Sequence, residues 1–220
     1  MTNYRADSSR AHQNLESLVA RPLFWVMLII TIMAAVTWNS FRLHKMPDPL
    51  PNLGKVENFE LLDQYGLPFG SSDLENKAWV ANFISTRGPA SCPESIAKMA
   101  EIQHRVRGLS TGFRLITFTV DPEFDIPEKL LAQAKEYRAS PNLWRFLAGP
   151  IDPIKTVAAS GLKTSMNKDA STEKLEGLFN GTYYVLVDRN MEIRAYFDLN
   201  DGDVVDQVVR TAGILANRGY

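Results

Sequence analysis

Hydrophobic residues are most concentrated in one run near the start of the chain. Residues 22–41 carry no charged side chain, and the stretch from Leu23 to Val36 is apolar except for one threonine. Twenty helical residues extend for about 30 Å, which matches the hydrocarbon thickness of a bilayer. Trp25 and Trp38 lie near the two ends, where amphipathic rings favour the membrane interface. The pattern therefore predicts a transmembrane helix over residues 22–41.

The flanks of this run disfavour both a cleaved signal peptide and a buried core helix. The polar lead of residues 1–21 is long for a signal peptide, no small-residue cleavage pattern follows, and a proline-rich stretch comes next. Basic residues do not orient the helix, because three lie on each side: Arg5, Arg10 and Arg21 before it, and Arg42, Lys45 and Lys55 after it. Charge alone leaves the side of the following domain open.

Past the run, the chain changes to a globular pattern. We expect a polar tail over residues 1–21, a proline-rich tether over residues 42–55 and one folded domain over residues 56–220. Apolar spacing predicts strands over 59–63, 78–84, 113–120, 143–147, 182–187 and 193–197, and helices over 94–107, 127–138, 154–160 and 203–216. This order predicts an α/β fold, a thioredoxin-like sandwich whose mixed central sheet has helices on both faces.

Composition narrows the possible functions. The chain of 220 residues is 45% hydrophobic and 22% charged, which suits a globular domain. Its net charge of −1 gives no basic excess for binding nucleic acid. Its single cysteine excludes an internal disulfide and a zinc site built mainly from cysteines.

That cysteine, Cys92, occupies the position of greatest chemical interest. It follows the predicted strand over 78–84 and a short loop, and Pro93 suits the first turn of the predicted helix. The positive end of a helix dipole and free backbone N–H groups favour a thiolate, and Arg87 is close enough in sequence to add to this effect. We therefore take Cys92 as a candidate thiolate. The alternative is a buried, unreactive cysteine that packs as a small apolar side chain.

Four segments of the chain resemble the motifs of one family in their order and spacing. They are FELLDQYG at 59–66, VDPEFDIPE at 120–128, NLWRFLAG at 142–149 and a C-terminal hairpin with YVLVD at 184–188 and YF at 196–197. Together they resemble the SCO/SenC family over residues 56–216. Members of that family are membrane-anchored thioredoxin-like proteins associated with copper delivery to cytochrome c oxidase. The resemblance implies the same fold and a related function for this chain.

The metal motif of that family is only partly matched. It runs Cys-Pro-Asp-x-Cys-Pro with a distant histidine, and the same frame here is GPASCP from Gly88 to Pro93. Cys92 keeps the second cysteine, whereas Gly88 replaces the first and Asn180 stands at the histidine position. The resemblance therefore implies Cys92 as the one retained metal-ligand position. Because Cu(I) favours soft thiolate and thioether donors, we expect any copper site of a single chain to be weak.

Other possible metal donors are poorly placed in the sequence. His104 follows Cys92 by twelve positions on the same predicted helix, a separation of about 18 Å along the axis. His12 and His44 fall outside the predicted domain, and Met166 is the one further side chain that could approach the thiol. Copper held between two chains, or with ligands from a partner, stays open.

An acidic loop follows the strand predicted over 113–120. Its carboxylates are Asp121, Glu123, Asp125 and Glu128. Asp125 stands three residues before Glu128, with Pro127 between them, and this spacing is typical of a capping box. We expect Asp125 to cap the next helix rather than to take part in carboxylate chemistry.

These observations predict a divergent SCO/SenC-like protein of the inner (plasma) membrane, with its soluble domain on the periplasmic or equivalent side. It would assist the assembly, or the copper or thiol handling, of a respiratory cytochrome oxidase. Its partner would be an oxidase subunit or another assembly or redox protein. We expect no resident cofactor other than copper at a weak site, and no classical enzyme activity, with thiol–disulfide exchange through Cys92 left open. The alternatives are a single-cysteine thiol oxidoreductase or peroxidase, and a non-catalytic scaffold that keeps only the fold.

Overall fold

The computed structural model of the chain describes residues 22–43, 50–88, 91–109, 111–159 and 181–218. The chain divides into two compact units, Met1–Pro49 and Leu50–Tyr220. We describe each unit by itself.

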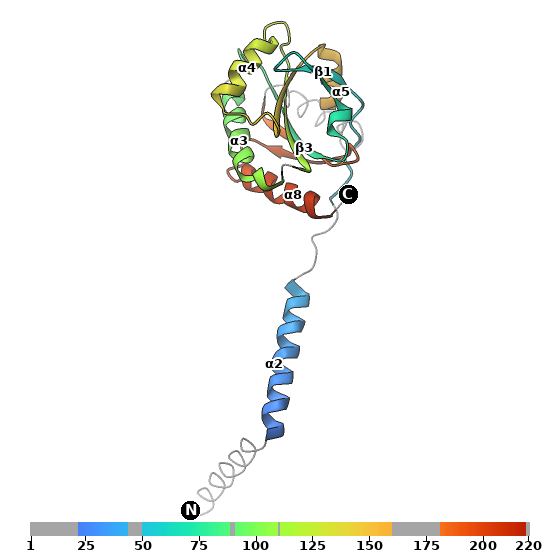
Figure 1. The fold of residues 1–220 in the computed structure, drawn as a ribbon, viewed down its shortest axis with the longest axis vertical. Helices are drawn as coiled ribbons and strands as arrows, with labels where there is room; N and C mark the ends of the chain where they lie inside the picture. The colour runs from blue at the N-terminus through green and yellow to red at the C-terminus, as the bar shows by residue number, and fades with distance from the viewer. Residues whose placement is uncertain (1–21, 44–49, 89–90, 110, 160–180, 219–220) are drawn as a thin grey trace, which may run out of the picture. The chain divides into compact units, whose positions relative to one another are not determined.

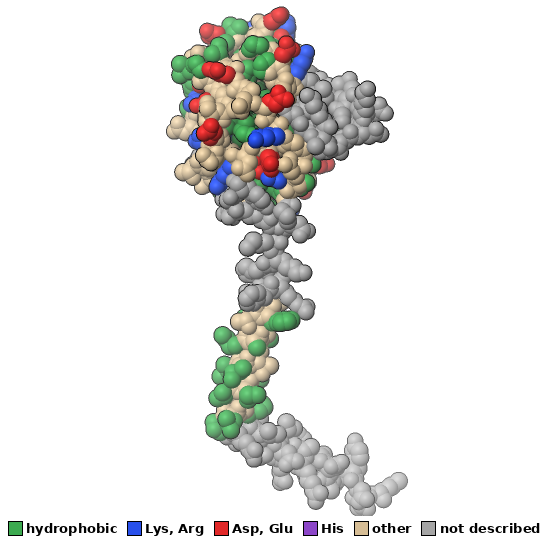
Figure 2. Space-filling view, turned by 90° about the vertical axis from the view of Figure 1, so that its right-hand side faces the viewer, with side chains coloured by type: hydrophobic (Ala, Val, Ile, Leu, Met, Phe, Trp, Pro, Cys, Tyr) green, Lys and Arg blue, Asp and Glu red, His purple; other side chains and the backbone are tan. Residues whose placement is uncertain are grey.

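The first unit contains one helix, α2 (Pro22–Leu43). Its segment Pro22–Asn39 is long and apolar enough to cross a membrane, and none of that segment is buried inside the protein. Figure 2 shows hydrophobic side chains along the length of this helix. The hydroxyl groups of Thr31 and Thr37 donate to backbone carbonyls four residues earlier, at Met27 and Met33. These hydroxyl groups are thus satisfied within the helix.

The second unit is built on one mixed sheet of seven strands in the order β2-β1-β5-β4-β3-β6-β7. The strands are β1 (Glu60–Asp63), β2 (Pro68–Gly70), β3 (Ala78–Ile84), β4 (Phe113–Thr119), β5 (Trp144–Ala148), β6 (Tyr183–Val187) and β7 (Ile193–Asp198). The central strands β3, β4 and β5 are parallel, and all other pairs are antiparallel. The predicted strands are confirmed, and the short β2 is an addition.

Helices cover both faces of the sheet, which confirms the thioredoxin-like sandwich (Figure 1). The helices are α3 (Ser91–Arg105), α4 (Pro127–Glu136), α5 (Ile151–Ala159) and α8 (Val204–Arg218), with short 3-10 turns η1 (Ser71–Leu74) and η2 (Arg107–Leu109). Buried residues of α3, α4 and α8 belong to one hydrophobic cluster, and those of α5 to a second. Side chains of β3 point alternately to the two faces of the sheet, so they are divided between the two hydrophobic clusters. The first cluster contains Ala78, Val80 and Ile84, and the second contains Trp79, Ala81 and Phe83.

The segment that enters the folded unit pairs with the edge strand β7. The backbone N–H of Leu53 donates to the carbonyl of Ile193 at 2.8 Å, and that of Val56 donates to the carbonyl of Met191 at 2.8 Å. Residues from Leu50 onward therefore belong to the folded unit, although the sequence pattern assigns residues 50–55 to the tether.

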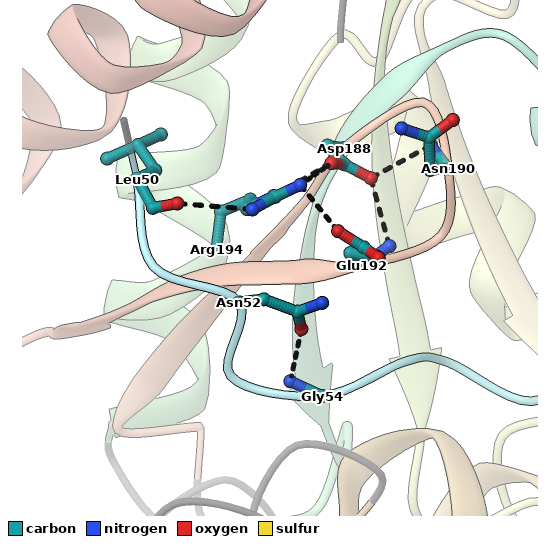
Figure 3. Close-up of polar contacts among 7 residues, drawn as sticks. All are labelled: Leu50, Asn52, Gly54, Asp188, Asn190, Glu192 and Arg194. Atoms are coloured by element: carbon teal, nitrogen blue, oxygen red, sulfur yellow. Dashed lines mark hydrogen bonds and ion pairs between the residues drawn. The ribbon is translucent and has the colours of Figure 1, made fainter. Parts of the chain in front are cut away.

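A buried ion pair holds this segment in place (Figure 3). The Nε of Arg194 donates to Asp188 at 2.7 Å, and its Nη1 donates to the carbonyl of Leu50 at 3.1 Å. The other oxygen of Asp188 accepts from the backbone N–H groups of Asn190 and Glu192 in the turn before β7. Because the Asp188 side chain is only 1% exposed, this carboxylate is desolvated and depends on those donor groups.

Candidate functional site

Cys92 is the second residue of α3, and Pro93 follows it in the first turn. The strand β3 ends at Ile84, and the loop from Ser85 to Gly88 leads toward the helix. The structure thus confirms the predicted strand, loop and thiol at a helix start. Cys92 is 1% exposed and belongs to the hydrophobic cluster beneath α3.

Two glycines lie against the sulfur of Cys92. A Cβ atom built on Gly88 would lie 3.2 Å from Sγ, and one built on Gly181 would lie 3.3 Å from it. Gly181 has a φ of +74°, a left-handed conformation that favours glycine. The backbone of two loops therefore covers the thiol. Gly88 stands at the position of the first family cysteine, and its Cβ direction is toward the sulfur of Cys92.

Four of the residues considered as ligands lie outside the described residues. They are Asn180, Met166, His12 and His44. His104 is described, and it lies near the opposite end of α3 from Cys92, as its spacing predicts.

The electrostatic environment of Cys92 is unlike the one we expected. Burial raises the pKa of the thiol, and the charge of Asp125 raises it further, while a backbone hydrogen bond at Ser85 lowers it. Burial thus acts against the lowered pKa that the helix start would favour, and it supports the alternative of a buried, unreactive cysteine. Removal of the sulfur from water outweighs the favourable field at the start of the helix.

Arg87 does not compensate for the burial of the Cys92 thiol, because its guanidinium is paired with Asp121. Its Nε donates to Asp121 at 2.5 Å, its Nη2 donates to the second oxygen of Asp121 at 3.1 Å, and its guanidinium lies 4.6 Å from the centre of the Phe124 ring. The hydrogen bond from Arg87 holds the pKa of Asp121 below its usual value. Arg87 is thus paired with Asp121, and it is not among the groups that shift the pKa of Cys92.

Asp125 is also placed differently from the prediction. The N-cap of α4 is Ile126, and it has no side-chain capping hydrogen bond. Asp125 is fully buried and accepts hydrogen bonds from the backbone N–H of Thr86 at 3.0 Å, from the Thr86 hydroxyl and from the Thr119 hydroxyl at 2.6 Å. The capping box is therefore wrong, and Asp125 instead fastens the loop before Cys92 to the end of β4. The sequence does contain a signal for this arrangement. Thr86 comes just after β3, and Thr119 ends the neighbouring parallel strand β4.

A buried polar network anchors the first turn of α3 from below. The indole N–H of Trp144 donates to the Thr117 hydroxyl at 2.8 Å, and that hydroxyl donates to Asn82 at 2.7 Å. The amide of Asn82 donates to the Ser95 hydroxyl at 3.0 Å, and the Tyr184 hydroxyl donates to the Ser95 carbonyl at 2.8 Å. Ser95 lies one turn after Cys92, so four adjacent strands help to fix the position of the thiol.

Within the described residues, Cys92 is not accompanied by the set of side-chain donors that a copper ion would need. No group of three histidine, cysteine, aspartate or glutamate side chains suited to a metal exists among the described residues. The sulfur of Cys92 faces the backbone of Gly88 and Gly181, which offer no side-chain donor. Cu(I) prefers several soft ligands, so one buried thiol is a poor site.

This protein has a thioredoxin-like architecture, as the motifs implied. The architecture is defined by the order of the strands, by the helices on both faces of the sheet and by the loop that leads to a thiol at a helix start. The family model described as SCO1/SenC matches residues 48–212. The chain therefore belongs to the SCO1/SenC family.

Individual relatives agree with this assignment. The SCO1 protein homolog of Bacillus subtilis is 34% identical over 143 residues, which cover 64% of this chain and 72% of that protein. The SCO2-like protein of Rickettsia felis is 32% identical over 80 residues, which cover 36% of this chain and 39% of that protein.

Solved structures show the same fold. A SCO1/SenC family lipoprotein from Bacillus anthracis is 26% identical, with a TM-score of 0.62 over 74% of this chain and 96% of that chain. BsSco, a member of the Sco family of cytochrome c oxidase assembly proteins, is 24% identical, with a TM-score of 0.64 over 79% of this chain and 99% of that chain.

Proposed function

We propose that this protein is a membrane-anchored SCO1/SenC family member that assists the assembly of a respiratory cytochrome oxidase by binding a partner protein, without holding copper by itself. The observation that carries the proposal is Gly88. It stands at the place of the first family cysteine, its Cβ direction meets the sulfur of Cys92 at 3.2 Å, and it brings no ligand there. Names of relatives, including BsSco among the cytochrome c oxidase assembly proteins, support the assembly role.

Copper titration tests the first half of this proposal. The full-length protein in an uncharged detergent is titrated anaerobically with Cu(I) against a competing chelator. We expect no tight one-to-one copper retention by the wild-type monomer. The double variant Gly88→Cys/Asn180→His restores two ligand positions of the family motif, and we expect it to gain such retention. Gly88→Ser/Asn180→His is the matched control, because serine has nearly the size of cysteine without its soft donor. Tight copper binding by the wild-type monomer would overturn the proposal.

A second candidate function, thiol exchange through Cys92, is favoured by the position of the thiol at a helix start. Its burial and raised pKa instead favour partner binding. Complementation separates the two. In a host strain that lacks this protein, Cys92→Ser should restore oxidase activity if the protein acts by binding a partner. Loss of oxidase activity with a normal amount of the variant would favour thiol exchange.

We further propose that α2 anchors the chain in the inner membrane, with the second unit on the periplasmic or equivalent side. The length and apolar surface of α2 support an anchor, and the family assignment supports the side. The chain should remain in the membrane after carbonate extraction. External protease should cleave the second unit in spheroplasts. Release by carbonate, or protection of the second unit from the protease, would contradict this location.

A further inference from the structure

Two adjoining hollows lie on the folded unit at the end of the sheet away from Cys92. The first, of about 250 Å³, is lined by Lys77, Arg114, Asn142 and Arg145 among others. The second, of about 310 Å³, is lined by Tyr65, Leu131, Ala134, Lys135, Arg138 and Ala139 among others. Pro141 borders both, and the guanidinium of Arg145 lies 5.5 Å from the centre of the Tyr65 ring. Because they share Pro141, the two hollows lie side by side, and we treat them together as one cationic groove.

The groove is strongly cationic. Three basic side chains line the first hollow and two line the second, whereas Asp73 is the one carboxylate among their lining residues. Asp73 already accepts a hydrogen bond from the backbone N–H of Gly70 at 2.8 Å. On a chain with a net charge of −1, this local excess is not a consequence of composition.

Arg145 is the residue that points to a ligand. Its side chain is 25% exposed and forms an ion pair with Asp63 at 3.6 Å, a separation that is too long for a hydrogen bond. The other oxygen of Asp63 accepts from the backbone N–H groups of Tyr65 and Leu67. Within the described part of the chain, no acceptor lies at hydrogen-bond distance from the Arg145 guanidinium. The partly buried guanidinium of Arg145 therefore has hydrogen-bond donors left for a ligand.

Arg114 adds a second positive charge to the same hollow. Its Nη1 donates to its neighbouring backbone carbonyl, at Phe113, at 2.7 Å. Burial, followed by the charge of Arg145, holds the pKa of Arg114 below its usual value. Two like charges in one partly desolvated hollow repel each other, and a bound anion would relieve that repulsion.

We propose that this groove binds an extended acidic segment of a partner protein. A carboxylate of the segment lies in the first hollow against Arg114 and Arg145, where a guanidinium can donate two parallel hydrogen bonds. A neighbouring apolar side chain lies in the second hollow against Tyr65 and Leu131, and Lys135 and Arg138 meet further acidic residues at its rim. Tyr65 is 46% exposed, so it offers an amphipathic ring to such a side chain.

The groove and the Cys92 site occupy opposite ends of the parallel strands. Arg114 lies at the start of β4 and Asn142 precedes β5, whereas Ser85 follows the end of β3. The proposal deepens the proposed function, since it rests on the idea that this protein acts on a partner. Its test needs neither copper nor Cys92, so the groove proposal and the proposed function can fail separately.

The test measures binding of a short fluorescent peptide that alternates glutamate and leucine. Anisotropy is recorded with the full-length protein in an uncharged detergent, at low and high salt. Arg145→Gln should weaken binding about tenfold, the loss expected for one charge-assisted pair. The exposed double variant Lys135→Gln/Arg138→Gln should also weaken binding, and it leaves the buried part of the groove unchanged. Arg107→Gln, an exposed arginine outside both hollows, is the matched control and should bind normally.

Three results would overturn the proposal. One is equal binding by Arg145→Gln, by the double variant and by the wild type. Another is equal binding of a peptide with glutamine in place of glutamate. The third is Arg145-dependent binding of inorganic phosphate or of anionic lipid vesicles without any binding of the acidic peptide, since either would assign the groove to a different ligand.

Discussion

At the scale of single residues, one missing side chain changes the chemistry of the site. Gly88 lies beside Cys92 at the distance that a bonded pair of cysteines would need, but it carries no sulfur. Cys92 packs into the hydrophobic cluster under α3. Gly88 therefore offers the position of a second thiol beside Cys92 without supplying one.

The first prediction at this scale concerns the substituted position. In a disulfide, the Cβ of one cysteine lies about 3 Å from the sulfur of the other, and the Cβ direction of Gly88 gives 3.2 Å. Gly88→Cys should therefore form a disulfide with Cys92 under mild oxidation, seen by mass spectrometry as a loss of two mass units and of both free thiols. Gly88→Ser serves as the control for crowding against Ser85. Two thiols that stay free in folded, oxidised Gly88→Cys would contradict the geometry.

The second prediction follows from the raised pKa of Cys92. The folded protein should hold the thiol proton above the ordinary cysteine value of about 8.5. Alkylation by iodoacetamide should be slow at neutral pH and should rise with a midpoint above that value. The folded state binds this proton more tightly than the unfolded state does. The resulting stabilisation is therefore present below the ordinary pKa and lost as the pH rises through the folded value.

Two comparisons check this second prediction. The unfolded chain in denaturant should alkylate with an ordinary midpoint. Cys92→Ala should lose the part of the pH dependence of stability that belongs to the thiol. A midpoint below about 8.5 in the folded protein would show an activated thiolate instead.

At the scale of elements, α3 is fastened at both of its ends by buried amides. Near its start, Asn82 of β3 donates to Ser95. Near its end, Gln103 donates to the carbonyl of Arg138 at 3.1 Å and accepts from the backbone N–H of Ser140 at 2.7 Å. The two anchors are chemically alike, but only the first lies close to the thiol.

This similarity gives a matched pair of variants. Asn82→Leu and Gln103→Leu should each lower the free energy of unfolding by about 1–3 kcal/mol, the cost of leaving buried partners unsatisfied. Only Asn82→Leu should speed the hydrogen exchange of amides in the first turn of α3 and the alkylation of Cys92. Denaturant titration measures the stability, and exchange mass spectrometry locates the change. Equal effects of both variants on the first turn would refute a separate role for Asn82.

At the scale of the whole molecule, both outer strands of the sheet are partly protected from pairing with other strands. At one edge, Pro68 of β2 has no N–H group, and the N–H of Gly70 donates to Asp73. At the other edge, the entering segment pairs with β7 through Leu53. Protected edges prevent strand-to-strand association, so we expect partners to use surfaces such as the cationic groove rather than the edges of the sheet.

The entering segment depends on the buried pair of Arg194 and Asp188. Arg194→Gln leaves the Asp188 carboxylate buried without its cation, so the free energy of unfolding should fall by about 3–5 kcal/mol. Limited proteolysis should also become faster at residues 50–56, because the bond to the Leu50 carbonyl is lost. Arg210→Gln, at an exposed arginine of α8, is the control and should change neither measurement. Unchanged proteolysis in Arg194→Gln would show that strand pairing alone holds the segment.

The sequence by itself determined the apolar helix, the α/β order, most strand positions and the family, because these depend on local periodicity and on motif spacing. It also placed Cys92 at the start of a helix. Among the described residues it missed the strand β2, which spans three residues and has no periodicity to detect.

Only the tertiary structure decided the burial of the thiol and the hydrogen-bond partners of its charged neighbours. The helix-start argument for Cys92 is local, whereas burial depends on loops distant in sequence, including Gly181. Asp125 has the spacing of a cap, yet its partners Thr86 and Thr119 come from the ends of two parallel strands. Desolvation and long-range hydrogen bonds arise from packing, so residue spacing along one segment cannot reveal them.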